Sequence, residues 1–120
     1  MPPRPGEPMH AAHRTFAALL LIQAFDVWVH LASNMLEPLG VAANVMLAVG
    51  GWMILSTPAG ANGVGAANGF AFVVLNGVFI AVHGLTNPAT GNLRLPMLLL
   101  VACSLLALVV HVRAAQEAEQ

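Results

Sequence analysis

Four apolar runs, each long enough to cross a membrane as a helix, follow one another along the chain. They cover residues 15–36, 39–57, 69–86 and 95–112. A helix crosses a hydrocarbon core of about 30 Å with roughly 20 apolar residues. Because the connections between the runs are short, neighbouring helices are expected to be antiparallel. We therefore predict an all-α integral membrane protein with four transmembrane helices in an up-down-up-down antiparallel bundle.

Prolines and glycines indicate where these helices begin and end. Pro38 suits the first turn of the second helix, where its missing N–H group is no loss, and Pro96 has the same place in the fourth. Residues 58–68, PAGANGVGAAN, have the composition of a flexible loop. The pair Asn87 and Pro88 is expected to stop the third helix by turn chemistry.

Composition supports the membrane class and bounds the domain. Apolar residues make up 58% of the chain and charged residues 8%, against about 45–50% and about 25% in an average soluble domain. Residues 1–14 hold four prolines and are expected to be a disordered tail. Residues 114–120 are expected to be a polar tail in water. The transmembrane domain is then residues 15–113.

The few charges bear on partners and topology. The chain has four arginines, no lysine and a formal charge of -1, which lacks the basic stripe that nucleic acid requires. The expected partner is the lipid bilayer, with a homodimer or a larger membrane complex as further options. Arg4, Arg14 and Arg113 lie on one side of the membrane and Arg94 on the other. The positive-inside rule then places both termini in the cytoplasm, for a protein of the inner (plasma) membrane.

The first apolar run carries polar residues that face one way on a helix. They are spaced 3, 4, 3 and 4 residues apart, with one neighbour on the same stripe: Gln23, Asp26, His30, Ser33, Glu37 and the adjoining Asn34. Ionisable groups inside a bilayer cost a few kcal/mol each, so they face the interior of a bundle and mark function by default. We expect this stripe to face inward.

The other helices offer polar partners at matching depth. His30 and His83 of the third helix fall roughly 8 to 9 Å from the bilayer centre, on the non-cytoplasmic side, and Asn44 of the second helix lies at a similar depth. The predicted ligand or proton site consists of Asp26, His30, Asn34, Asn44 and His83. A supporting polar stripe is predicted from Gln23, Ser33, Glu37 and Asn76. The competing interpretation is that the amides and serines only hydrogen-bond between helices.

Asp26 and His30 are four residues apart, so the carboxylate can accept a hydrogen bond from the imidazole and orient it. Such a pair can hold and pass a proton, which favours a proton-linked small-ligand binding or transport unit. One alternative is a haem b or metal site ligated by His30 and His83, with Asp26 as a third metal ligand. Another is a non-catalytic accessory subunit of a larger membrane complex. No nucleophile with its base appears in the sequence, which argues against an enzyme.

In size, in number of spans and in the lone acid of its first helix, Asp26, the chain is similar to the small multidrug-resistance transporters. That resemblance implies a dimeric, proton-coupled exporter of four helices. The family has a glutamate where this chain has Asp26, and its third helix carries a Trp-Gly-x-Gly motif. The third helix here reads GFAFVVLNGVFIAVHG. The resemblance is therefore one of architecture.

Overall fold

The computed structural model describes residues 7–32, 38–86 and 91–119, and this part of the chain is a bundle of four α-helices. Its helices are α1 (Glu7–Ala32), α2 (Pro38–Ser56), α3 (Ala61–His83) and α4 (Leu95–Glu119), with a single 3-10 turn, η1 (Pro58–Gly60), before α3. All four are long and apolar enough to cross a membrane. The predicted all-α class and number of helices are confirmed.

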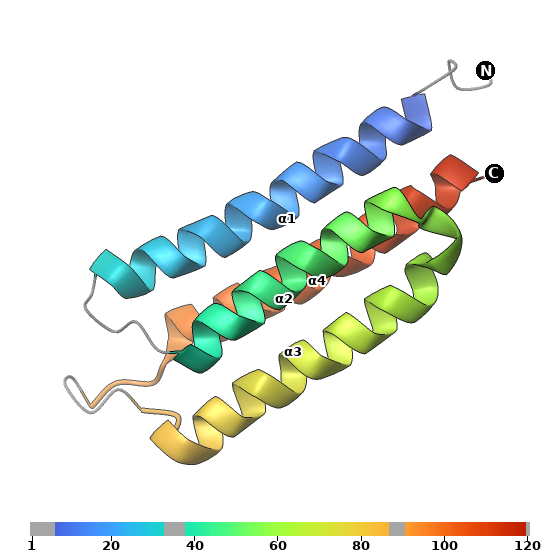
Figure 1. The fold of residues 1–120 in the computed structure, drawn as a ribbon. Coiled ribbons are helices and arrows are strands. Elements are labelled where there is room, and N and C mark those ends of the chain that lie inside the picture. Colours follow the sequence, from blue (N-terminus) through green and yellow to red (C-terminus); the bar gives the residue numbers. More distant parts are fainter. Residues whose placement is uncertain (1–6, 33–37, 87–90, 120) are drawn as a thin grey trace.

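The helices alternate in direction, and both ends of the described chain lie at the same end of the bundle (Figure 1). Each helix packs against its two neighbours around the ring, and α2 also packs against α4 across the middle. In the described part of the chain, α1 and α3 do not pack against each other. The bundle is 54 Å long and 24 by 20 Å across. Because α2 and α4 contact each other and α1 and α3 do not, α1 and α3 lie at the two ends of the longer diagonal.

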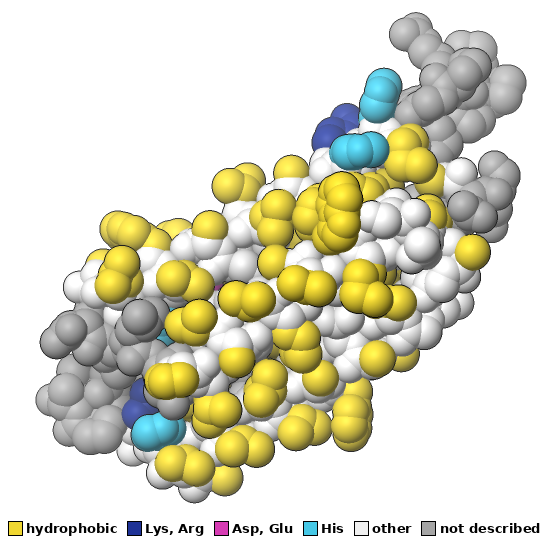
Figure 2. All heavy atoms as spheres, in the orientation of Figure 1, with side chains coloured by type: hydrophobic (Ala, Val, Ile, Leu, Met, Phe, Trp, Pro, Cys, Tyr) yellow, Lys and Arg dark blue, Asp and Glu magenta, His cyan; other side chains and the backbone are white. Residues whose placement is uncertain are grey.

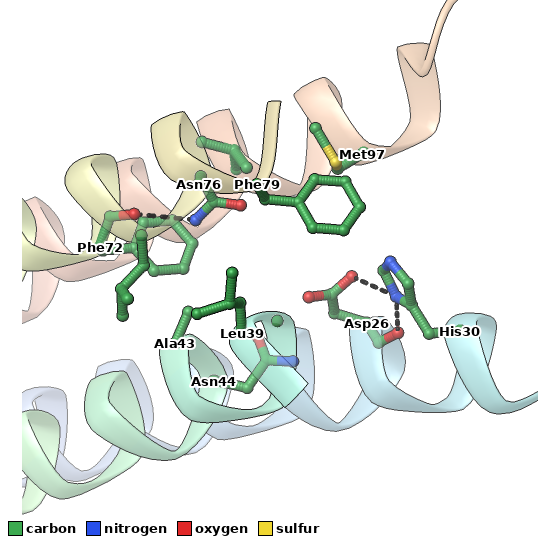
Figure 3. A pocket seen from close by; sticks show the side chains of 12 residues that line it. Asp26, His30, Leu39, Ala43, Asn44, Phe72, Asn76, Phe79 and Met97 are labelled. Carbon is green, nitrogen blue, oxygen red and sulfur yellow. Dashed lines mark hydrogen bonds and ion pairs between the residues drawn. The ribbon is translucent and has the colours of Figure 1, made fainter. Parts of the chain in front are cut away.

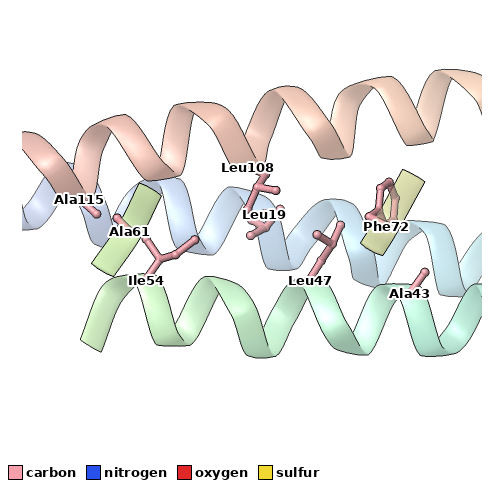
Figure 4. Packing of buried hydrophobic residues seen from close by; sticks show 8 residues of the cluster. All are labelled: Leu19, Ala43, Leu47, Ile54, Ala61, Phe72, Leu108 and Ala115. Carbon is pink, nitrogen blue, oxygen red and sulfur yellow. The ribbon is translucent and has the colours of Figure 1, made fainter. Parts of the chain in front are cut away.

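A cluster of small and branched apolar residues fills the axis of the bundle (Figure 4). Leu19, Leu47 and Ile54 are fully buried, and Phe72 and Leu108 are nearly so. Leu19, Leu47 and Leu108 come from α1, α2 and α4 and belong to the same cluster. We call these three residues the leucine layer. Water has no hydrogen-bond partner among such side chains, so we treat this section of the bundle as dry.

Two glycines let neighbouring helices approach closely. A Cβ atom on Gly51 would lie 2.8 Å from Cδ2 of Leu19, and one on Gly65 would lie 2.5 Å from Cγ2 of Val112. Both distances are shorter than a normal carbon contact of about 3.5–4.0 Å. The sequence therefore packs α2 on α1, and α3 on α4, through residues without side chains, as is common between membrane helices.

The first and last helices are longer than the sequence predicted. Helix α1 begins at Glu7, so residues 7–14 are helical and the prediction of a tail over all of 1–14 is wrong for them. Ala12 explains the extension, because it is buried in a second small cluster with Leu55 and Ala114. The same contact carries α4 on to Glu119, where a polar tail was expected from residue 114.

The third helix begins eight residues earlier and ends three residues earlier than predicted. The glycine-rich stretch expected to be a flexible loop is η1 followed by the first turns of α3. Ala61 and Gly65 are buried there, so packing outweighs the low helix propensity of glycine. Gly84 ends the helix with φ +80°, a conformation that glycine adopts without strain, and its N–H donates to the carbonyl of Ile80.

The surface of the bundle is apolar along its length. Figure 2 shows one face, where hydrophobic side chains cover the middle and the Arg and His side chains lie toward the two ends. Large exposed residues such as Leu21, Trp28, Phe70 and Leu106 are more than half exposed. In water such a surface would drive aggregation, whereas in a bilayer it contacts lipid. The structure therefore suits a multi-pass membrane protein.

Candidate functional site

A small cavity lies inside the bundle, toward the end at which α1 finishes and α2 begins (Figure 3). All four helices line it, and its polar lining consists of Asp26 and His30 of α1, Asn44 of α2 and Asn76 of α3. Its volume is about 30 Å³. A single water needs about 10–15 Å³ by this measure, so the cavity has room for about two water molecules.

Asp26 and His30 form a hydrogen-bonded pair within α1. Nδ1 of His30 lies 3.1 Å from Oδ1 of Asp26 and 2.7 Å from the carbonyl oxygen of the same residue. Both oxygens accept, so a hydrogen occupies Nδ1 and the neutral ring is the Nδ1–H tautomer. A further proton is gained or lost at Nε2. The helix thus fixes the ring by two contacts one turn away, as expected from the spacing of four residues.

Two asparagines complete the polar lining. The side chain of Asn44 is only 6% exposed, and it lines the cavity. Its amide can both donate and accept a hydrogen bond there. Asn76 donates from Nδ2 to the carbonyl of Phe72, 2.9 Å away, and can offer its amide oxygen to the cavity.

Phe79 lies between this lining and two residues near the end of the bundle, His83 and Arg94. Its ring lines the cavity beside Met97 (Figure 3). The ring of His83 lies 4.6 Å from the ring of Phe79, centroid to centroid, and the guanidinium carbon of Arg94 lies 5.2 Å from that centroid. A guanidinium over an aromatic face at this distance is a cation–π contact. Arg94 also donates from Nε to the carbonyl of Gly84, which fixes it there.

The structure brings part of the predicted site together. Asp26, His30 and Asn44 share one cavity, and the supporting residue Asn76 lines it as well. His83 is exposed and does not line the cavity, although its ring contacts Phe79, which does, so its predicted place in the site stays a prediction. Three further residues that were predicted for the site or its supporting stripe lie outside the described residues: Asn34, Ser33 and Glu37.

Gln23, predicted as part of the supporting stripe, points inward but to a different partner. Its Nε2 donates to Oγ of Ser104 on α4, 2.9 Å away, and both side chains are buried. Its Oε1 has no hydrogen-bond partner among the described residues. Gln23 is therefore an interhelical contact between α1 and α4, one turn from the cavity.

The haem and metal alternatives do not fit the arrangement of the described residues. A metal held by Asp26, His30 and His83 is excluded there, because no three His, Cys, Asp or Glu side chains come together. A haem between His30 and His83 would need a flat space for the macrocycle between the two rings. Instead, Phe79 contacts His83, and the cavity beside His30 holds about two waters.

A second histidine inside the bundle, His111 of α4, was not part of the site predicted from the sequence. Its side chain has no exposed surface. Nδ1 lies 2.8 Å from the hydroxyl of Thr15 and Nε2 lies 2.9 Å from the carbonyl oxygen of Gly51. Phe16 stacks on the ring, with centroids 5.7 Å apart. The ring thus joins α1, α2 and α4, and every polar atom of it has a partner.

His111 and the cavity lie in different parts of the bundle. Thr15, which contacts His111, is eleven residues before Asp26, a rise of about 16 Å along α1. The leucine layer lies between these levels. His111 and the cavity are therefore two separate polar sites, and the buried Gln23–Ser104 contact lies between their levels.

Comparison of the chain with protein-family models, with curated proteins and with solved structures finds no match in any of the three. The function is therefore argued from the geometry of the cavity and its polar lining. Of the two buried polar sites, the cavity is the one with space beside a titratable pair. The His111 site is fully packed and fully hydrogen-bonded.

Proposed function

We propose that the chain is a multi-pass membrane protein whose Asp26–His30 pair takes up and releases a proton inside the bundle, as part of a proton-linked transport or binding function. The observation that carries the proposal is the pair itself, held by contacts of 3.1 and 2.7 Å beside a cavity large enough for water. A carboxylate and an imidazole within an apolar bundle are costly, and such groups are typical of proton relays.

The volume of the cavity limits the size of what can bind beside the Asp26–His30 pair. With room for about two waters, it holds a proton carried on water or on the imidazole, but no organic molecule in this conformation. Binding of a small organic ligand would require the helices to separate. Proton uptake is therefore assigned to the Asp26–His30 pair in this conformation. A transported ligand would bind only in an open form of the bundle.

The proposed topology follows from the arginines. Arg14 and Arg113 lie at the end of the bundle that holds both termini, and Arg94 lies at the other end. The positive-inside rule then favours cytoplasmic termini. The cavity, near the end that carries Arg94, would lie in the non-cytoplasmic half of the membrane.

Protonation of His30 can be measured directly. The full chain, labelled with nitrogen-15 in its histidines and placed in lipid nanodiscs, would be titrated from mildly alkaline to mildly acidic pH. We expect the His30 resonance, identified by its loss in His30→Gln, to change reversibly between neutral and charged ring. In Asp26→Asn, which removes the negative partner, the midpoint of that change is expected to shift.

A matched control is Glu117→Gln, which also replaces a carboxylate by an amide but lies on α4, away from the cavity. It should leave the His30 titration unchanged. The proposal is overturned if His30 stays in one protonation state throughout, or if Asp26→Asn titrates as the wild type does.

A further inference from the structure

A second hollow lies outside the bundle, between α3 and α4. Its volume is about 440 Å³, more than ten times that of the inner cavity. Apolar residues line most of its length, and polar side chains lie at one end: Asn62 of α3 with Arg113 and Gln116 of α4. Those three residues belong to the end of the bundle that holds both termini.

Small residues on α3 create this groove. Gly65, Ala66 and Gly69 line it from one side, and Leu108 and Val112 line it from the other. A Cβ on Gly69 would meet only Cδ2 of Leu108, at an ordinary 3.6 Å, so that position is loosely covered. Because α3 and α4 are adjacent helices that can each cross a membrane, the groove between them faces the bilayer.

The polar end of the groove carries a positive charge. Arg113 is exposed, and within the described part of the chain its guanidinium forms no ion pair. Glu117, one turn further along α4, does not line the groove and is not paired with Arg113. Gln116 and Asn62 add amide hydrogen-bond donors beside the guanidinium. A phosphate is a preferred partner of an unpaired guanidinium, through short charge-assisted hydrogen bonds.

We propose that this groove binds one anionic phospholipid, with its phosphate at Arg113 and Gln116 and an acyl chain along the apolar part toward Leu105. Charge complementarity and the order of the lining, polar at the membrane surface and apolar toward the centre, favour a lipid. A second copy of the chain presents mainly apolar helix surface, which would leave the charge of Arg113 unpaired in the interface. Burial of an unpaired charge is unfavourable.

The test is native mass spectrometry of the full chain released from nanodiscs that contain phosphatidylglycerol and phosphatidylcholine in equal amounts. We expect the wild type to retain one phosphatidylglycerol in preference to phosphatidylcholine. Arg113→Gln should lower that retention about fivefold, the effect of one basic residue near an anionic surface. Arg14→Gln is the matched control, because Arg14 is exposed at the same end of the bundle but lies on α1, outside the groove.

A second pair of variants tests the apolar part. Ala66→Leu would fill the groove and is expected to lower lipid retention, whereas Ala67→Leu, at the neighbouring exposed position outside the lining, should not. Equal losses in Arg113→Gln and Arg14→Gln would overturn the proposal in favour of general surface charge. Dimers that Ala66→Leu abolishes, with lipid retention unchanged, would overturn it in favour of a second copy.

Discussion

The imidazole Nε2 of His111 lies 2.9 Å from the carbonyl oxygen of Gly51, and this contact joins α4 to α2 across the shorter diagonal of the bundle. The carbonyl can only accept, so Nε2 carries a hydrogen. Oγ1 of Thr15 lies 2.8 Å from Nδ1 and 2.9 Å from the carbonyl oxygen of Ala12, and its single proton serves one of them at a time; donation to Nδ1 completes the hydrogen bonds of a neutral ring. His111 is therefore a structural residue at the level where three helices meet.

His111→Ala is expected to lower the free energy of unfolding by about 2–4 kcal/mol, because it opens a space and leaves Thr15 and Gly51 without a shared partner. Thermal or denaturant unfolding in detergent measures the change. His13→Ala provides the control, since His13 is exposed and contacts only the Met9 carbonyl of its own helix. Equal effects of the two variants would contradict a structural role for His111.

Two glycines of α3 allow a matched test of close helix packing. Gly65→Ala places a methyl group 2.5 Å from Val112 and should destabilise the bundle by about 1–3 kcal/mol. Gly63→Ala has open space around it and should stabilise the helix by about 0.5–1 kcal/mol. The difference between their unfolding free energies is the measurement. A Gly65→Ala protein as stable as the Gly63→Ala protein would show that α3 and α4 are further apart.

The contact between Gln23 and Ser104 is suited to a double-mutant cycle. Gln23→Ala, Ser104→Ala and the double variant should give a coupling energy between about 0.6 and 1.7 kcal/mol, the range of interhelical hydrogen bonds in membrane proteins. Ser104→Ala alone leaves the Gln23 amide buried without its acceptor. Additive effects of the two single changes would mean that the bond does not form in the membrane.

The natural Cys103 tests whether α4 is embedded in lipid. Its side chain is on the outside of the bundle in the middle of an apolar helix. A charged maleimide enters hydrocarbon poorly, so a thiol embedded in lipid is out of its reach. We expect no labelling in intact membranes and rapid labelling after solubilisation in SDS. Rapid labelling of intact membranes would contradict membrane insertion of α4.

The same reagent tests the orientation of the chain. Glu117→Cys, combined with Cys103→Ser, places the single thiol near the end of α4 outside the apolar part. If the termini are cytoplasmic, the reagent labels this thiol in inverted vesicles and not in whole cells. The opposite pattern would reverse the topology proposed from Arg14, Arg94 and Arg113.

The number of helices could be predicted from the sequence because each apolar run has the length of a membrane span. Helix ends were harder to place. Ala12 and Ala114 end up in a shared buried contact, and nothing in the local sequence distinguishes them from tail residues. The glycine-rich stretch before Gly69 looked like a loop because propensity alone does not include the packing of Gly65 on Val112.

The site was predictable where its residues share one helix. A spacing of four residues was enough to pair Asp26 with His30. Depth alone could not place residues of different helices, because it gives the level and not the direction in which a side chain points. His83 was therefore assigned to the site on depth, and the structure puts Phe79 between it and the cavity. His111 was missed because its partners are a hydroxyl and a backbone carbonyl.

The leucine layer determines from which end of the bundle protons could reach the Asp26–His30 pair. Leu19, Leu47 and Leu108 are packed in the apolar core on the side of the cavity toward the two termini. If the Asp26–His30 pair exchanges protons as proposed, this packing restricts the exchange to the other end of the bundle in this conformation. Delivery to the opposite face would need the three leucines to move apart, which makes this layer the barrier that any transport cycle has to open.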